Sequence, residues 1–173
     1  MPSATIIRLG GLAAILAGVL RTGSSFIPYS TSKPGAGLEL FYLVIDALIL
    51  FGLLGIYAYQ HEKVGVTGFL GFLPALIGTA IIAGPDGAIG GVDMYVAGSM
   101  LITFGLTVFS ISCLMARSLP LLAPLLWILS TVVGVGGFLI KGPAVMFIIA
   151  GLAFGLAFIV AGIKVWSDPS LRK

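Results

Sequence analysis

The stretch LELFYLVIDALILFGLLGIYAYQ, residues 38–60, decides the fold class of this sequence. It is an almost unbroken apolar run. At about 1.5 Å per residue, a helix of this length crosses the hydrocarbon core of a bilayer, which is about 30 Å thick. One carboxylate, Asp46, lies well inside the run. The stretch therefore predicts a transmembrane helix that carries an acid within the membrane.

The composition extends this prediction to the whole chain. Of the 173 residues, 59% are hydrophobic and only 9% are charged, whereas soluble domains carry about 25% charged residues. We predict an all-α, polytopic transmembrane helical bundle that forms a single domain, residues 1–173. The lysines and arginines lie near the ends of the apolar runs, a pattern typical of topology signals and not of nucleic-acid binding.

Six apolar runs predict six helices, separated by short turns that contain glycine, proline or charged residues. Their expected bounds are 5–27, 38–60, 64–83, 94–116, 119–140 and 143–166. Six crossings place both termini on one side of the membrane, and that side carries more lysine and arginine than the other. By the positive-inside rule we expect the N- and C-termini to be cytoplasmic, in a plasma membrane.

A short motif recurs on alternate predicted helices. It reads LILFGL at residues 48–53, LITFGL at 101–106 and AFGL at 153–156. The spacing of about 50 residues predicts three repeated helical hairpins. Coincidence is the alternative, because glycine and apolar residues are common throughout the chain.

Asp46 and Arg21 form the candidate polar site. A charge inside a membrane costs about 2.5–3.5 kcal/mol and normally has a partner. If the first helix extends to Ile27, Arg21 lies at nearly the same depth as Asp46, which predicts a salt bridge that fixes the register of the two helices. A proton or cation site at Asp46, or an acid that contacts a ligand, stays open as an alternative.

Residues for other chemistry are scarce. The chain has no asparagine, a single cysteine and a single histidine, and no spacing typical of a catalytic set or a phosphate loop. We expect no enzyme, no cofactor and no metal site. An enzyme acting on lipid would need His61, Asp86 and Asp93 to converge on a cleft.

Stripes of small residues predict close helix packing. They comprise Gly10, Ala14 and Gly18 in the first helix, and Gly151, Ala153, Gly155, Ala157 and Ala161 in the last. A stripe left over could pack against a second copy or another membrane subunit.

These observations lead to two functional hypotheses. The first is a non-enzymatic membrane protein that acts as an accessory or scaffolding subunit, or that binds lipid or an apolar small molecule. Its expected partners are the lipid bilayer, a second copy or other membrane subunits, and no nucleic acid. The alternative is a small channel or transporter for a proton, a cation or a small hydrophobic solute, with Asp46 as the coordinating group.

Overall fold

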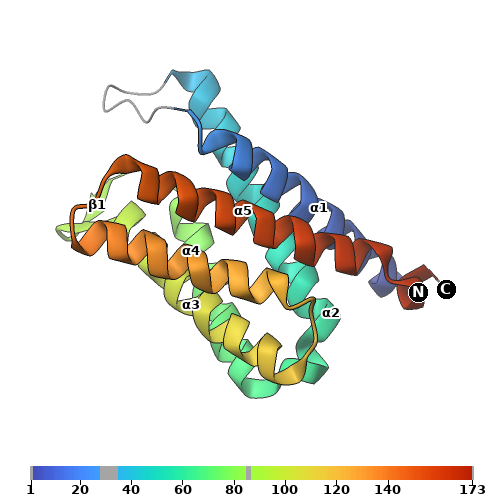
Figure 1. Ribbon diagram of the computed structural model, residues 1–173. Coiled ribbons are helices and arrows are strands. Elements are labelled where there is room, and N and C mark those ends of the chain that lie inside the picture. The colour runs from blue at the N-terminus through green and yellow to red at the C-terminus, as the bar shows by residue number, and fades with distance from the viewer. Residues whose placement is uncertain (1, 28–34, 85–86, 173) are drawn as a thin grey trace.

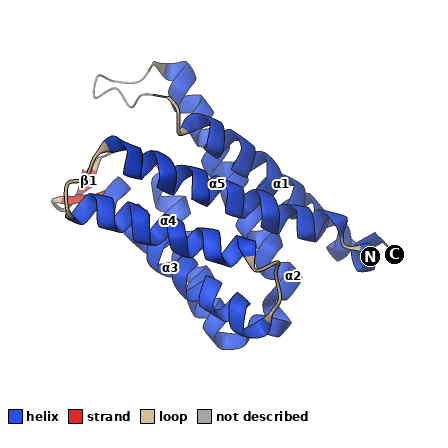
Figure 2. Ribbon diagram, in the orientation of Figure 1, coloured by secondary structure: helices blue, strands red, loops and turns tan. Residues whose placement is uncertain are grey.

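The computed structural model describes residues 2–27, 35–84 and 87–172, which form an all-helical bundle (Figures 1 and 2). Its helices are α1 (Pro2–Ser24), α2 (Ala36–Ile82), α3 (Met94–Ala116), α4 (Leu122–Leu139) and α5 (Ala144–Ser167). Two short strands, β1 (Ala88–Ile89) and β2 (Val92–Asp93), pair before α3, and a 3₁₀-helix, η1 (Pro169–Arg172), follows α5. All five α-helices are long and apolar enough to cross a membrane, as the composition predicts.

The longest helix, α2, folds back on itself. Its 47 residues would extend about 70 Å if straight. However, Gly65 has φ 58° and ψ −153°, a backbone conformation that is essentially restricted to glycine. The rings of Tyr57 and Phe72, fifteen residues apart, stack with centroids 4.1 Å apart. Gly65 therefore separates a first arm, residues 36–64, from a second arm, residues 66–82.

The structure differs from the predicted helix bounds in several places. The predicted helices 38–60 and 64–83 lie within the single element α2, so six separate helices are not confirmed. The bend comes at Gly65, because Glu62 and Lys63 are good helix formers and lack the conformational freedom of glycine.

Several other helix ends differ from the predicted bounds by a few residues. Helix α1 ends at Ser24, before the predicted Ile27, and the hydroxyls of Ser24 and Ser25 both donate to the Arg21 carbonyl. Such bonds compete with continuation of the helix. Helix α4 begins at Leu122, and Pro120 disfavours helical geometry in the residue before it.

Neighbouring segments pack antiparallel, and glycines allow the closest approaches. A Cβ atom at Gly10 would lie 2.5 Å from the Gly55 Cα, where α1 crosses the first arm of α2. A Cβ at Gly18 would lie 2.4 Å from the Gly155 carbonyl oxygen, where α1 crosses α5. Helix α1 thus uses its small-residue stripe twice, on two faces, within the chain.

Aromatic side chains fill the middle of the bundle. This aromatic layer comprises Tyr57 and Phe72 from the two arms of α2, Phe109 from α3, Trp127 from α4 and Phe158 from α5. The Tyr57 ring centroid lies 4.1 Å from that of Phe72 and 6.4 Å from that of Phe109. The Trp127 centroid lies 6.2 Å from that of Phe109 and 5.2 Å from that of Phe158. Apart from the half-buried Tyr57, every member is at most 5% exposed. Five segments from four helices therefore meet in one well-packed core.

The threefold repeat stays a prediction. The glycine of the first motif copy, Gly52, packs on α1, and that of the second, Gly105, packs on the second arm of α2. In both copies the contact is with the preceding helical segment. The third copy differs, because Gly155 packs on α1 and not on α4.

Candidate functional site

The predicted pair of Asp46 and Arg21 comes from two neighbouring segments, the first arm of α2 and α1. The contacts of Gly10 with Gly55 and of Gly52 with Ala14 set an antiparallel register between these segments. That register places Arg21, in the last turn of α1, at the level of Asp46. Both side chains are half-buried. Asp46 is engaged by a neighbour in the structure, and the salt bridge to Arg21 remains a prediction.

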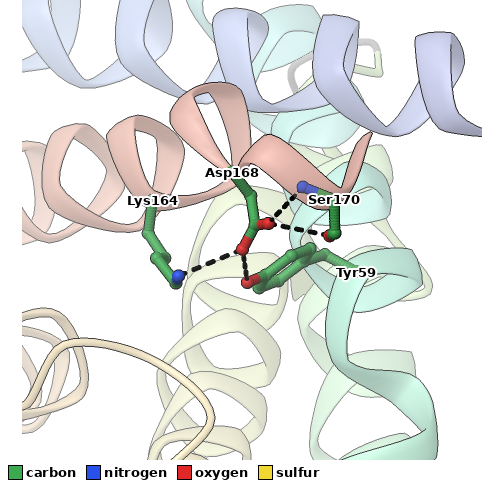
Figure 3. Close-up of polar contacts among 4 residues, drawn as sticks. All are labelled: Tyr59, Lys164, Asp168 and Ser170. Carbon is green, nitrogen blue, oxygen red and sulfur yellow. Dashed lines mark hydrogen bonds and ion pairs between the residues drawn. The ribbon is translucent and has the colours of Figure 1, made fainter. Parts of the chain in front are cut away.

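The end of the bundle opposite Arg21 and Asp46 holds a polar cluster that was not predicted from sequence (Figure 3). Asp168, which ends α5, accepts hydrogen bonds from the Tyr59 hydroxyl (2.5 Å) and the Lys164 ammonium (3.0 Å) on one carboxylate oxygen. The other oxygen accepts from the Ser170 amide (2.9 Å) and hydroxyl (2.7 Å). These bonds tie the end of α5 to the first arm of α2.

The cluster also changes the acidity of its carboxyl group. The hydrogen bond from Tyr59, followed by those from Ser170 and Lys164, holds the pKa of Asp168 well below its ordinary value. The sequence carried one indication of this arrangement, because Lys164 and Asp168 are four residues apart and neighbour each other on a helix. Tyr59 lies 109 residues away along the chain, and no local pattern identifies it as a partner.

A buried polar contact adjoins the aromatic layer. The Ser118 hydroxyl donates to the side-chain oxygen of Gln60 at 2.6 Å, and Gln60 is 1% exposed. The amide nitrogen of Gln60 and the indole nitrogen of Trp127 are buried without a hydrogen-bond partner. Cys113 is buried nearby. This contact links the first arm of α2 to the turn between α3 and α4.

An open groove of about 310 Å³ lies between α3 and α4. Its lining residues are Met100, Thr103, Phe104, Thr107, Thr131 and Val135. The threonine hydroxyls already have acceptors within the protein. Thr103 donates to the Ser99 carbonyl (2.6 Å), and Thr107 lies 2.8 Å from the Thr103 carbonyl and 3.0 Å from the Thr131 hydroxyl. The groove therefore presents an almost entirely apolar wall.

The residues of a lipid-enzyme site do not come together. His61 lies just before the α2 bend, whereas Asp93 caps α3 and accepts a hydrogen bond from the Val96 amide at 3.0 Å. The second arm of α2 runs antiparallel to α3, so the length of α3 separates His61 from Asp93. Asp86 lies outside the described residues. Within the described ranges, no group of three or more His, Cys, Asp or Glu could hold a metal ion.

The small-residue stripes predicted for partner binding are used inside the chain. Gly10 and Ala14 contact the first arm of α2, and Gly18 contacts α5. On α5, Gly151 and Gly155 contact the end of α1. The three alanines of α5 are buried: Ala153, Ala157 and Ala161. These stripes thus pack within the chain, and the expected contact with a second copy or another subunit stays a prediction.

The comparisons with known proteins add no relative from which an activity can be carried over. No protein-family model matches the sequence, and neither a curated protein nor a solved structure matches the chain at a significant level.

Proposed function

We propose that the protein is a non-enzymatic integral membrane protein that binds the chain of a lipid, or a similar extended apolar molecule, in the groove between α3 and α4. The supporting observation is the chemistry of the groove wall. Its hydroxyl groups are directed to acceptors within the protein, so they offer little to a polar solute. Apolar and aromatic side chains such as Met100 and Phe104 make up the rest of the wall.

The proposed topology has six crossings. They are α1, the two arms of α2, α3, α4 and α5, and the bend at Gly65 makes the two arms separate crossings. The start of α1 and η1 pack together at one end of the bundle (Figure 1). Lys63, Arg117 and Lys164 lie toward the same end, which supports a plasma-membrane orientation with cytoplasmic termini.

The aromatic layer supports binding over transport. Its members come from both arms of α2 and from α3, α4 and α5, and they occupy the place where a pore between these segments would run. A route through the bundle would have to displace large buried rings. The groove, in contrast, is accessible from outside the bundle. An accessory or scaffolding role would also use this outer surface.

Native mass spectrometry of the detergent-solubilised protein tests the groove. We expect the wild type to retain a bound lipid or apolar molecule. Thr131→Phe, which fills the groove, should lose most of that retention. Val132→Phe is the matched control, because Val132 neighbours Thr131 on α4, is 64% exposed and does not line the groove. Equal retention by all three proteins would refute this site.

Asp46 supports a second candidate, a small cation or proton transporter. The observation that favours it is the half-buried acid at the level of Arg21 in the first arm of α2. Flux of protons and cations into liposomes, wild type beside Asp46→Asn, tests it. Flux that disappears in a well-folded Asp46→Asn variant would replace the lipid-binding proposal, and absence of flux in the wild type would eliminate the transporter.

A further inference from the structure

A stacked cation lies at the end of the bundle where α1 begins. The Arg8 guanidinium carbon lies 4.7 Å from the centroid of the Trp166 ring. Close packing of α1 on α5 holds the pair together, because a Cβ at Gly11 would lie 2.8 Å from the Trp166 amide nitrogen. A stacked guanidinium of this kind is held in a fixed plane. Arg8 and Trp166 are both half-buried, so the site is neither deep in the core nor fully in solvent.

The Arg8 guanidinium has no anionic partner among the residues that the structure describes. Its Nε atom is buried without a hydrogen-bond acceptor. In the described part of the chain, no carboxylate lies within 4.0 Å of the group. A buried N–H donor without an acceptor is costly, so the Nε atom leaves a hydrogen bond of the guanidinium unmade.

The acid nearest to Trp166 along the chain already has hydrogen-bond partners of its own. Asp168 lies two residues beyond Trp166, but both of its oxygens accept hydrogen bonds from Tyr59, Lys164 and Ser170 (Figure 3). Neutralising Arg8 with Asp168 would require that cluster to break. The position therefore keeps a positive charge that an external anion can satisfy.

We infer that Arg8, stacked on Trp166, binds the phosphate of an anionic phospholipid headgroup. Tryptophan is favoured at the boundary between hydrocarbon and headgroups, and a guanidinium matches phosphate oxygens with two parallel hydrogen bonds. Another cation at this end, Lys63, raises the local concentration of anionic lipid. The inference rests on the proposed membrane placement but not on the groove between α3 and α4.

The test measures the thermal unfolding midpoint in zwitterionic nanodiscs as phosphatidylglycerol is added. The wild type should be stabilised in a saturable manner. Arg8→Gln should need about tenfold more anionic lipid for the same shift, because a hydrogen bond to a charged group is lost. Arg8→Lys keeps the charge but not the planar group, and its apparent affinity should lie between the two.

Arg117→Gln is the matched control. Arg117 is an exposed arginine at the same end, just after α3, and it should leave the response close to that of the wild type. Equal losses in Arg8→Gln and Arg117→Gln would show diffuse attraction and overturn the inference. So would a wild-type response in Arg8→Lys, which decides the matter if Arg8→Gln does not fold.

Two further measurements distinguish a lipid headgroup from a soluble anion and test the membrane placement. The same stabilisation by inorganic phosphate in zwitterionic nanodiscs would show a site for a soluble anion and overturn the lipid assignment. Extraction of the wild type from membranes by alkaline carbonate would refute the membrane placement itself. Lipid retention in the groove, measured in parallel, shows whether the proposed function survives a failure at Arg8.

Discussion

Replacement of Gly65 by alanine tests the bend on which the proposed topology depends. Gly65 has φ 58° and ψ −153°, and apart from its chain neighbours and the adjacent helix backbone no atom lies within 4 Å of the position that a Cβ would occupy. The substitution therefore creates no clash, and its effect comes from the backbone alone. A non-glycine residue in this region costs about 1–3 kcal/mol. We expect Gly65→Ala to lower the free energy of unfolding by that amount.

Gly23→Ala is the control for this experiment. Gly23 lies within α1, and a Cβ there also meets no atom within 4 Å. In a helix, alanine is about 0.5–1 kcal/mol more favourable than glycine, so Gly23→Ala should be neutral or stabilising. The two variants should thus differ by about 1.5–4 kcal/mol. The assay is unfolding by sodium dodecyl sulfate in mixed micelles, followed by circular dichroism.

A gain in stability from Gly65→Ala would refute the reasoning. It would mean that residue 65 has helical geometry and that α2 continues straight through this position. A continuous helix of 47 residues is more than twice as long as a bilayer core requires. The antiparallel packing of the second arm on α3 and the stacking of Tyr57 on Phe72 would then be wrong as well.

Three further predictions concern the core and the polar cluster. Trp127→Ala should destabilise the protein by about 3–5 kcal/mol, because Trp127 is 1% exposed and contacts both Phe109 and Phe158. Unfolding in detergent measures this, and a variant as stable as the wild type would contradict the central position of the ring. Ser118→Ala should lower the free energy of unfolding by about 1–3 kcal/mol, since it removes the donor to the buried Gln60 oxygen. An unchanged unfolding midpoint would show that another group replaces the hydroxyl. The pKa of Asp168 is lowered by folding, so the advantage of wild type over Asp168→Asn should be constant above about pH 5 and should decrease as the pH falls below that value. Thermal unfolding between about pH 2 and pH 7 measures this, and an advantage that grows on acidification would contradict it.

The sequence predicted the helical class and most helix positions, because these depend on long apolar runs that are visible locally. The predicted turn between residues 60 and 64 contains Glu62 and Lys63, and charged residues often mark the end of a membrane segment. The structure instead bends at Gly65, where the requirement is a backbone conformation and not a polar side chain. Periodicity of apolar residues carries no information on which of several nearby positions adopts that conformation.

The candidate site was harder to predict, because its contacts join residues far apart along the chain. Asp46 stands out from its apolar surroundings, whereas Asp168 lies in the polar segment that follows the last apolar run. Its partner Tyr59 is one of several aromatic residues near the end of an apolar run, and nothing in the sequence links it to Asp168. The aromatic layer likewise draws on both arms of α2 and on α3, α4 and α5, and no local pattern distinguishes Trp127 from other large apolar residues.

The depth of Asp46 relative to the aromatic layer bears on the choice between the two functional proposals. Asp46 precedes Tyr57 by eleven residues in the first arm of α2, which corresponds to about 16 Å along the helix. A route from Asp46 to the other end that passed between α2, α3, α4 and α5 would meet the packed rings. Conduction would require Phe109 and Trp127, each at most 1% exposed, to move from the core. Binding of a proton or cation at Asp46 without flux is thus compatible with this packing, whereas steady flux would demand a second arrangement of the aromatic layer.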